Sequence, residues 1–254
     1  MKQDRATKRQ IIEDWNGKFP MLRKYSENSI FMRMDCFLVG ISFDTSQFNP
    51  DSYWPCFEIR GLWHDNISKN GLLFEPLNII THIDYSKHRE RFEESCNLAK
   101  GQFAFMFHET VQLSDFFNCL KILNRIRRGR ITLYERSTII ETICAVATLF
   151  DNDKELKKEI IEKAVQETKC WNEDHFKQLY HKSVEDWRNQ LFAYFFDDKN
   201  MVEIVKANIL MPKIERLKVG HIINDGKTAR EVLMRPDYPL KNKFLDWLNS
   251  FLYN

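Results

Sequence analysis

The stretch that decides the fold runs from Ile30 to Phe43 and reads IFMRMDCFLVGISF. It is rich in β-branched and aromatic residues and lacks the punctuation of a helix, which favours a β-strand. Both of its alternating faces are apolar in places, as at Phe37-Leu38-Val39, and this indicates a sheet covered on both sides. We therefore predict the first strand of a sheet over this stretch.

The segments that follow continue the same pattern. The turn signal Asn49-Pro50-Asp51 lies in a polar loop and separates the first strand from a second. A later strand is interrupted by Glu75-Pro76. The apolar segment QFAFMFHETVQL fits a helix or a strand, and we interpret it as a last strand that closes the sheet. The expected elements are strands at 53–63, 72–83 and 102–113, and helices at 4–16 and 86–100.

The second half of the chain reads as a series of amphipathic helices from Ser114 onward. Thr132-Leu-Tyr-Glu135 fits a capping box, in which hydroxyl and carboxylate satisfy each other's orphan backbone N–H groups. The clearest helix follows Asn172, because apolar residues from Phe176 to Phe195 recur at spacings of three and four. Short connections between these helices favour antiparallel neighbours in a bundle.

Together these patterns predict an α+β protein, with a small antiparallel sheet and flanking helices followed by an all-helical, bundle-like C-terminal domain. Near residue 112 the strand-like segments give way to amphipathic helices. The expected domains are therefore a mixed α+β domain at residues 1–112 and an all-helical domain at residues 113–254. A chain of 254 residues is long enough for two small domains.

The composition is that of an ordinary globular protein, with 43% hydrophobic and 29% charged residues. Only 8 residues are glycine, which disfavours glycine-rich nucleotide-binding folds, and we expect no cofactor. The six cysteines are spaced 20 or more residues apart without a CxxC pair. No apolar stretch is long enough to span a bilayer or serve as a secretory signal. The expected location is the cytoplasm, with reduced thiols and no membrane partner.

One group of residues has the composition of a metal or acid–base site. His82 and Asp84 point to the same side if they lie on a strand, and His88 would join them from the start of the next helix. His64 and Asp65 are expected nearby in the meander. Imidazole and carboxylate groups together suit zinc, iron or manganese. These five residues are the candidates for a catalytic role, but their spacing fixes no ligand geometry and no metal is assigned.

The positive charge of the chain is concentrated in its middle. Residues 86–134 hold 9 basic and 5 acidic residues, whereas the segments on either side are balanced to within one charge. Such a cluster complements the dipole at a helix C-terminus, and it is also a candidate site for an anion or a nucleic-acid backbone. The cluster consists of Arg125, Arg127, Arg128 and Arg130.

Three hypotheses for the function follow. The first is an intracellular, non-enzymatic protein-binding module, such as an accessory subunit, a toxin antagonist or a regulatory adaptor, whose partner is another protein. It is favoured by the 20 Phe, 8 Tyr and 6 Trp residues and by the absence of catalytic spacing. The alternative is a nucleic-acid-binding protein that uses the four arginines. A further alternative is a metal-dependent hydrolase that uses the histidines and aspartates.

Overall fold

The computed structural model describes residues 5–45, 49–64, 67, 71–76, 82–103, 107–113, 115–116, 132–150, 154–197, 200–224 and 227–228. The chain divides into two compact units. Unit 1 comprises residues 1–119 and 207–223, and unit 2 comprises residues 120–206 and 224–254. Unit 1 is therefore assembled from two separate stretches of the sequence.

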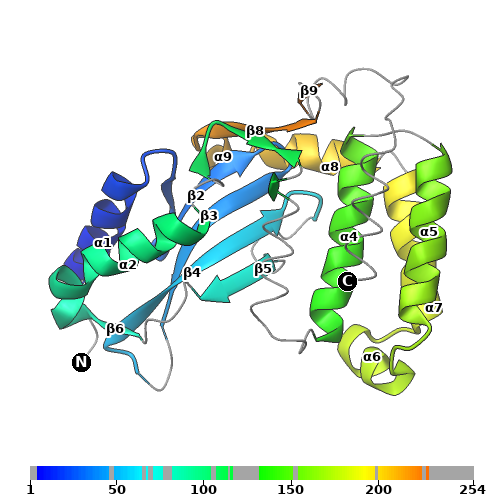
Figure 1. The fold of residues 1–254 in the computed structure, drawn as a ribbon, viewed down its shortest axis with the longest axis horizontal. Helices are drawn as coiled ribbons and strands as arrows, with labels where there is room; N and C mark the ends of the chain where they lie inside the picture. Colours follow the sequence, from blue (N-terminus) through cyan, green and yellow to red (C-terminus); the bar gives the residue numbers. More distant parts are fainter. Residues whose placement is uncertain are drawn as a thin grey trace. The chain divides into compact units, whose positions relative to one another are not determined.

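Unit 1 is built around a mixed β-sheet that curls into a half-barrel (Figure 1). Its main path is β5-β4-β3-β2-β8-β7, with β1 beside β2 and β6 beside β4. The neighbours from β5 to β2 are antiparallel, whereas β8 is parallel to both β2 and β7. The strands are β1 (Arg23–Ser26), β2 (Ser29–Met34), β3 (Phe37–Asp44), β4 (Ser52–Gly61), β5 (Gly71–Pro76), β6 (Ile83–Asp84), β7 (Thr110–Gln112) and β8 (Val219–Asn224).

The predicted fold class is wrong on two points. The sheet is mixed rather than small and antiparallel, and β8 shows that the C-terminal half is not all-helical. The sequence of β8, VGHIIN, is short and alternates between buried and partly exposed positions. Both of its partners, β2 and β7, lie more than 100 residues earlier in the chain. A strand that depends on such distant partners has no strong local pattern.

The predicted strand over residues 30–43 is a hairpin of two strands. β2 and β3 pair with Met34 opposite Phe37, which leaves Asp35 and Cys36 as a two-residue turn. Asp35 has a φ of 48°, a left-handed conformation that aspartate tolerates better than most residues. Its side chain accepts a hydrogen bond from the backbone N–H of Ile222 in β8 at 2.6 Å. The turn is thus held by a contact with a distant segment.

Two helices of unit 1, α1 (Arg5–Lys18) and α2 (His88–Phe103), lie side by side over the sheet (Figure 1). They confirm the helices predicted at 4–16 and 86–100. Trp15 of α1 is fully buried, and its ring centroid lies 5.5 Å from that of Phe43 and 5.6 Å from that of Phe92. The unit also contains the short elements η2 (Tyr85–Lys87) and α9 (Pro212–Glu215).

The described part of unit 2 is mainly helical. Its elements are α4 (Leu133–Phe150), α5 (Lys154–Thr168), α6 (Glu173–Tyr180), α7 (Val184–Phe192), the π-helical turn η4 (Ala193–Asp197), the first part of α8 (Asn200–Ile209) and β9 (Lys227–Thr228). The single helix expected after Asn172 is two helices. His181 ends α6 with a φ of 55°, and the hydroxyl of Ser183 caps α7 by accepting from the N–H of Asp186 at 2.9 Å.

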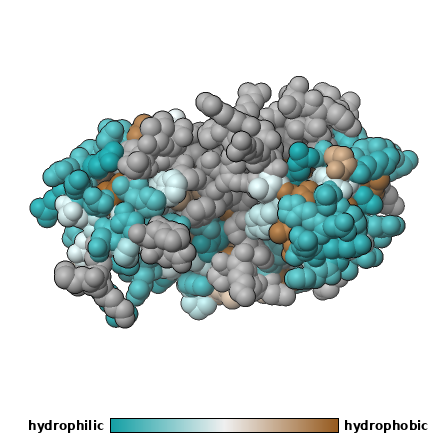
Figure 2. Space-filling view, turned by 90° about the horizontal axis from the view of Figure 1, so that it is seen from below, coloured by the Kyte–Doolittle hydropathy of each residue, from teal (hydrophilic) through white to brown (hydrophobic). Residues whose placement is uncertain are grey.

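The surface is predominantly hydrophilic where the view in Figure 2 shows described residues, with hydrophobic residues exposed in small groups. Among the residues that the structure describes, four large apolar side chains are exposed, namely Tyr134, Leu179, Leu210 and Met211. No helix in the described ranges combines the length and the apolar character that crossing a membrane requires.

Candidate functional site

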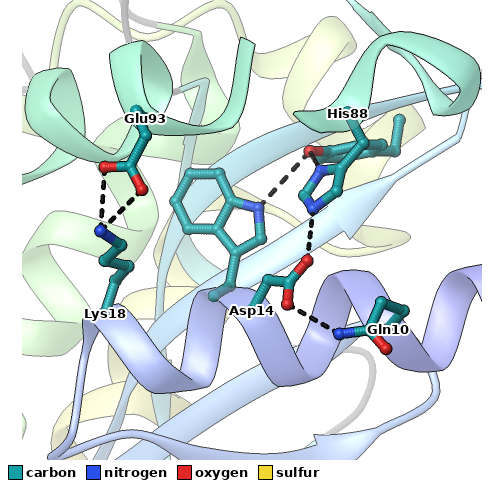
Figure 3. A network of polar contacts seen from close by, with 7 residues as sticks. Gln10, Asp14, Lys18, His88 and Glu93 are labelled. Atoms are coloured by element: carbon teal, nitrogen blue, oxygen red, sulfur yellow. Dashed lines mark hydrogen bonds and ion pairs between the residues drawn. The ribbon is translucent and has the colours of Figure 1, made fainter. Parts of the chain in front are cut away.

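A buried polar network joins α1, β4 and α2 (Figure 3). The Nε2 atom of His88, the first residue of α2, lies 2.9 Å from Oδ2 of Asp14 on α1. The Nδ1 atom of the same ring lies 2.7 Å from the hydroxyl oxygen of Tyr53, near the start of β4. His88 is only 6% exposed and Tyr53 only 1%, so water competes little for these hydrogen bonds.

For a neutral His88 ring, the network has one consistent arrangement of protons. An ionised Asp14 can only accept, so Nε2 of His88 carries the hydrogen and donates to it. Nδ1 then accepts from the Tyr53 hydroxyl, because burial raises the pKa of Tyr53 and keeps the phenol protonated. Trp15 Nε1 donates to the Tyr53 oxygen at 3.5 Å, and Gln10 donates to the other carboxylate oxygen of Asp14 at 2.8 Å. Every polar group in the series has a partner.

This arrangement gives His88 a structural role. Both ring nitrogens are engaged, so the imidazole directs no lone pair at a ligand. The hydrogen bonds connect two helices to a strand, and they fix the ring of Tyr53. Beside them, Lys18 of α1 lies 2.7 Å from a carboxylate oxygen of Glu93 on α2 (Figure 3). The same two helices are therefore connected at a second point.

Burial favours the protonated form of three cysteine thiols in the described part of the chain. Burial raises the pKa of Cys96 on α2 to about 12, and the nearby Glu93 acts in the same direction. Burial also raises the pKa of Cys36 and of Cys144 well above the ordinary value. The thiolate is the nucleophilic form of cysteine, so these three side chains do not supply a nucleophile.

A cavity of about 280 Å³ lies beside Tyr53 within unit 1. Apolar and aromatic side chains form part of its wall, and charged and polar side chains contribute the rest. The lining comes from α1 (Lys8, Ile11, Ile12), the β1–β2 turn (Glu27, Asn28), the end of β3 (Phe43, Thr45), β4 (Tyr53) and η2 (Tyr85). A concave site with a few polar groups on an apolar wall is the usual form of a small-ligand pocket.

The structure separates the residues predicted to form a metal or acid–base site. The ring of His82 lies 4.8 Å from the ring of Trp54, and Asp84 pairs with Lys87 at 3.7 Å. His88, by contrast, is directed at Asp14. Each of the three side chains therefore has a different partner in the structure.

The other predicted ligands do not join them. His64 follows the far end of β4, whereas β6 pairs with the first residues of that strand. The length of a ten-residue strand, roughly 30 Å, separates these positions. Asp65 lies outside the described residues, as do Arg125, Arg127, Arg128 and Arg130. Within the described part of the chain, no three His, Cys, Asp or Glu side chains are grouped so that they could hold a metal ion.

Two adjacent apolar side chains are exposed at the bend between α8 and α9. Leu210 is 68% exposed and the adjacent Met211 is 38% exposed. The backbone of this bend is held on both sides: the Leu210 N–H donates to Ala207, and the Met211 carbonyl accepts from Ile214 at 2.8 Å. The buried Asn208 side chain also donates to the carbonyl of Leu62 at 2.7 Å. Leu210 and Met211 are thus displayed by a rigid segment, and we call the pair the apolar bend.

A basic surface lies on the same unit. Arg216, which follows the last residue of α9, donates to the carbonyl of Lys24 on β1 at 3.3 Å, and the ammonium of Lys213 lies 4.9 Å from the ring centroid of Tyr25. The carbonyl of the neighbouring Lys218 accepts from the backbone of β2. Among the described residues, none of these four cations has an ion-pair partner. The basic surface consists of Lys24, Lys213, Arg216 and Lys218.

Sequence reasoning missed these features for different reasons. Asp14 stands next to Trp15 in an amphipathic helix, and a carboxylate beside the buried stripe is the one local signal of the network. The basic surface gives no such signal, because Lys24 and residues 213–218 lie almost 190 positions apart. Only the pairing of distant segments brings these cations together.

No protein-family model matches the chain, and the comparisons with curated proteins and with solved structures found no match either. A function for this chain has to come from its own surfaces and cavities, since function resides in sites rather than in folds.

Proposed function

We propose that the protein is a non-enzymatic protein-binding module and that the apolar bend is part of its binding surface. The observation that carries the proposal is the exposure of Leu210 and Met211 at adjacent positions. Burying a leucine or methionine side chain in an interface contributes about 1.5–3 kcal/mol. A few well-packed residues near the centre of an interface commonly provide most of its binding energy, and methionine is enriched in interfaces relative to the rest of the surface.

The rigidity of the bend supports this proposal. A partner that binds a mobile segment must offset the entropy lost when the segment becomes ordered. Here the backbone hydrogen bonds of residues 207–215 and the anchor at Asn208 already fix the bend. Ile214, four residues after Leu210, is fully buried and secures the short helix α9 to unit 1. Binding at this point carries a small ordering cost.

The test is to purify the full chain from its native cells with a mild tag and to identify proteins that co-elute in stoichiometric amount. The variant L210S/M211S should retain at most about a tenth of the partner, since even one lost apolar contact of about 1.4 kcal/mol gives a tenfold change. L179S is the matched control, because it removes an exposed leucine from unit 2. Equal recovery with both variants would contradict the proposed surface, and a wild-type chain that elutes alone would contradict the function.

The basic surface favours a second candidate function, the binding of nucleic acid. Four cations without ion-pair partners are suited to a phosphate backbone. Its test is fluorescence anisotropy with a labelled oligo(dT) over a series of salt concentrations. Affinity should fall as salt rises, and K24E/K213E/R216E should weaken it, whereas K169E, an exposed change in unit 2, should not.

The predicted arginine cluster is tested in the same assay. Changing Arg125, Arg127, Arg128 and Arg130 together to alanine distinguishes this cluster from the basic surface, since the two sets share no residue. Affinity that is independent of salt, or that neither set of substitutions lowers, would contradict nucleic-acid binding.

A further inference from the structure

The cavity beside Tyr53 has a wall of aromatic rings that are fixed in position. The ring centroids of Phe43 and Tyr53 lie 5.8 Å apart with an edge-on geometry, and those of Tyr53 and Tyr85 lie 5.5 Å apart. All three residues are at least nine-tenths buried. The hydroxyl of Tyr53 is held by His88, so the polar network fixes the central ring of this wall. The cavity is preformed.

Ile11 and Ile12 of α1 extend the apolar part of the wall, and both are almost completely buried. Aromatic pairs favour edge-on and offset arrangements, and a flat ring that enters the cavity could pack in this way against the aromatic wall. The volume of about 280 Å³ lies just below the range found for sites of drug-sized ligands. These dimensions suit a ligand with one aromatic ring.

One side chain gives the cavity a charge preference. The ammonium of Lys8 lies 6.0 Å from the ring centroid of Tyr85 and has no ion-pair partner among the described residues. The single carboxylate in the lining, that of Glu27, already faces Arg5 at 3.6 Å. Asn28 and Thr45 add an amide and a hydroxyl to the lining. The group that best complements this side of the cavity is an anion that can accept hydrogen bonds.

We propose that this cavity is a binding site for a small aromatic carboxylate, with its ring against Phe43, Tyr53 and Tyr85 and its carboxylate towards Lys8. A carboxylate pairs with the ammonium and accepts from the amide of Asn28, whereas a ligand amine would be repelled by Lys8. The cavity shares no residue with the apolar bend or the basic surface, so either proposal can fail without the other.

The test is titration of the full-length protein with phenylacetate, benzyl alcohol and benzylamine, three single-ring probes that differ in charge. Phenylacetate should bind most tightly and benzylamine least. The variant K8M should weaken phenylacetate binding about fivefold, the upper value for an exposed ion pair, and leave benzyl alcohol unchanged. K8R should keep the preference for the anion, and K169M, which removes a lysine from unit 2, should bind like the wild type.

The location of binding is checked by methyl NMR of the same samples. Phenylacetate should shift the methyl signals of Ile11 and Ile12, and these shifts should saturate with the same affinity as the titration. Three outcomes would overturn the proposal: no saturable binding of phenylacetate, equal affinity for all three probes, or shifts confined to methyl groups elsewhere. An unchanged affinity in K8M would overturn the assignment of the carboxylate to Lys8.

Discussion

Asp35 connects two parts of unit 1 that are far apart in the sequence. Its backbone forms the left-handed turn between β2 and β3. One carboxylate oxygen accepts from the N–H of Ile222, and the other lies 3.0 Å from Nδ1 of His221. A single buried side chain therefore fixes both a turn and the position of β8.

Replacing Asp35 with alanine should lower the free energy of unfolding by about 2–4 kcal/mol. Alanine leaves the buried N–H of Ile222 without an acceptor, and it is strained at a φ of 48°. D35N should cost much less, because asparagine tolerates this conformation and its side-chain oxygen can accept the same hydrogen bond. Urea unfolding monitored by tryptophan fluorescence measures both variants. Similar losses in D35A and D35N would contradict this account of the turn.

The stability difference between the wild type and D35N should depend on pH. Burial raises the pKa of Asp35, although the N–H of Ile222 and the ring of His221 act in the opposite direction. The folded protein therefore binds this proton more tightly than the unfolded chain does. The resulting stability is fully present below the unfolded pKa of about 3.9 and is lost as pH rises through the raised folded pKa. D35N lacks this titration, so its free energy of unfolding should rise relative to that of the wild type as pH increases through that window. A difference between the two proteins that stays constant with pH would contradict the raised pKa.

Tyr53 should contribute more to stability through its hydroxyl than Tyr85 does. In Y53F, Nδ1 of His88 and the indole N–H of Trp15 lose their partner in a buried site, which should cost about 1–3 kcal/mol. Y85F is the control, since its hydroxyl makes no hydrogen bond among the described residues. Chemical denaturation of both variants measures the difference, and equal stabilities would show that the network does not hold the ring.

At the scale of elements, β8 is the strand that makes the sheet mixed. It fits between β2 and β7 because Gly220 lies close to two backbone carbonyls. A Cβ atom at this position would lie 3.0 Å from the oxygen of His108 and 3.2 Å from that of Glu109. It would also lie 2.5 Å from the Cε of Met32, although that methyl group can move. A side chain at this position would therefore force the neighbouring backbone to shift by a few tenths of an ångström.

G220A should therefore destabilise the protein by about 1–3 kcal/mol, the usual cost of overpacking. The matched control is G101A in α2, where an added Cβ meets nothing within 4 Å. Alanine at that helical position should stabilise the protein by up to about 1 kcal/mol. Thermal unfolding of the two variants should shift the midpoint in opposite directions. A midpoint for G220A at or above that of the wild type would show that β8 does not pack closely here.

The elements that the sequence predicted correctly are those with a strong local period. Helix α1 follows from Ile11, Ile12 and Trp15, which repeat at helical spacing and are all buried. The hairpin β2–β3 was predicted as one strand, because its turn contains neither glycine nor asparagine and depends on a hydrogen bond from Ile222. The helix expected after Asn172 was too long, because its apolar period continues through the break at His181.

At the scale of the whole molecule, the fold of unit 1 is complete only when residues 207–223 pack with the first 119 residues. Native-state hydrogen exchange should show this. The amides of His221 and Ile222, which donate to Glu109 and Asp35, should exchange as slowly as those of β3. In D35A these amides and those of β7 should exchange faster together, while α5 of unit 2 keeps its protection. Protection of β8 that follows α5 instead of β3 would contradict the assignment of this strand to unit 1.

The sequence by itself determined the helices with a clear amphipathic period, the strand character of residues 30–43 and the start of a helix after Asn172, because these depend on contacts between near neighbours. Tertiary structure decided the position of β8, the turn at Asp35, the buried role of His88, the aromatic cavity and the basic surface. Each of these needs two segments that lie tens to nearly two hundred residues apart. A local sequence pattern indicates which face of a helix or strand is buried, but not which segment packs against that face. The sheet and the candidate sites of this protein are made by those partners.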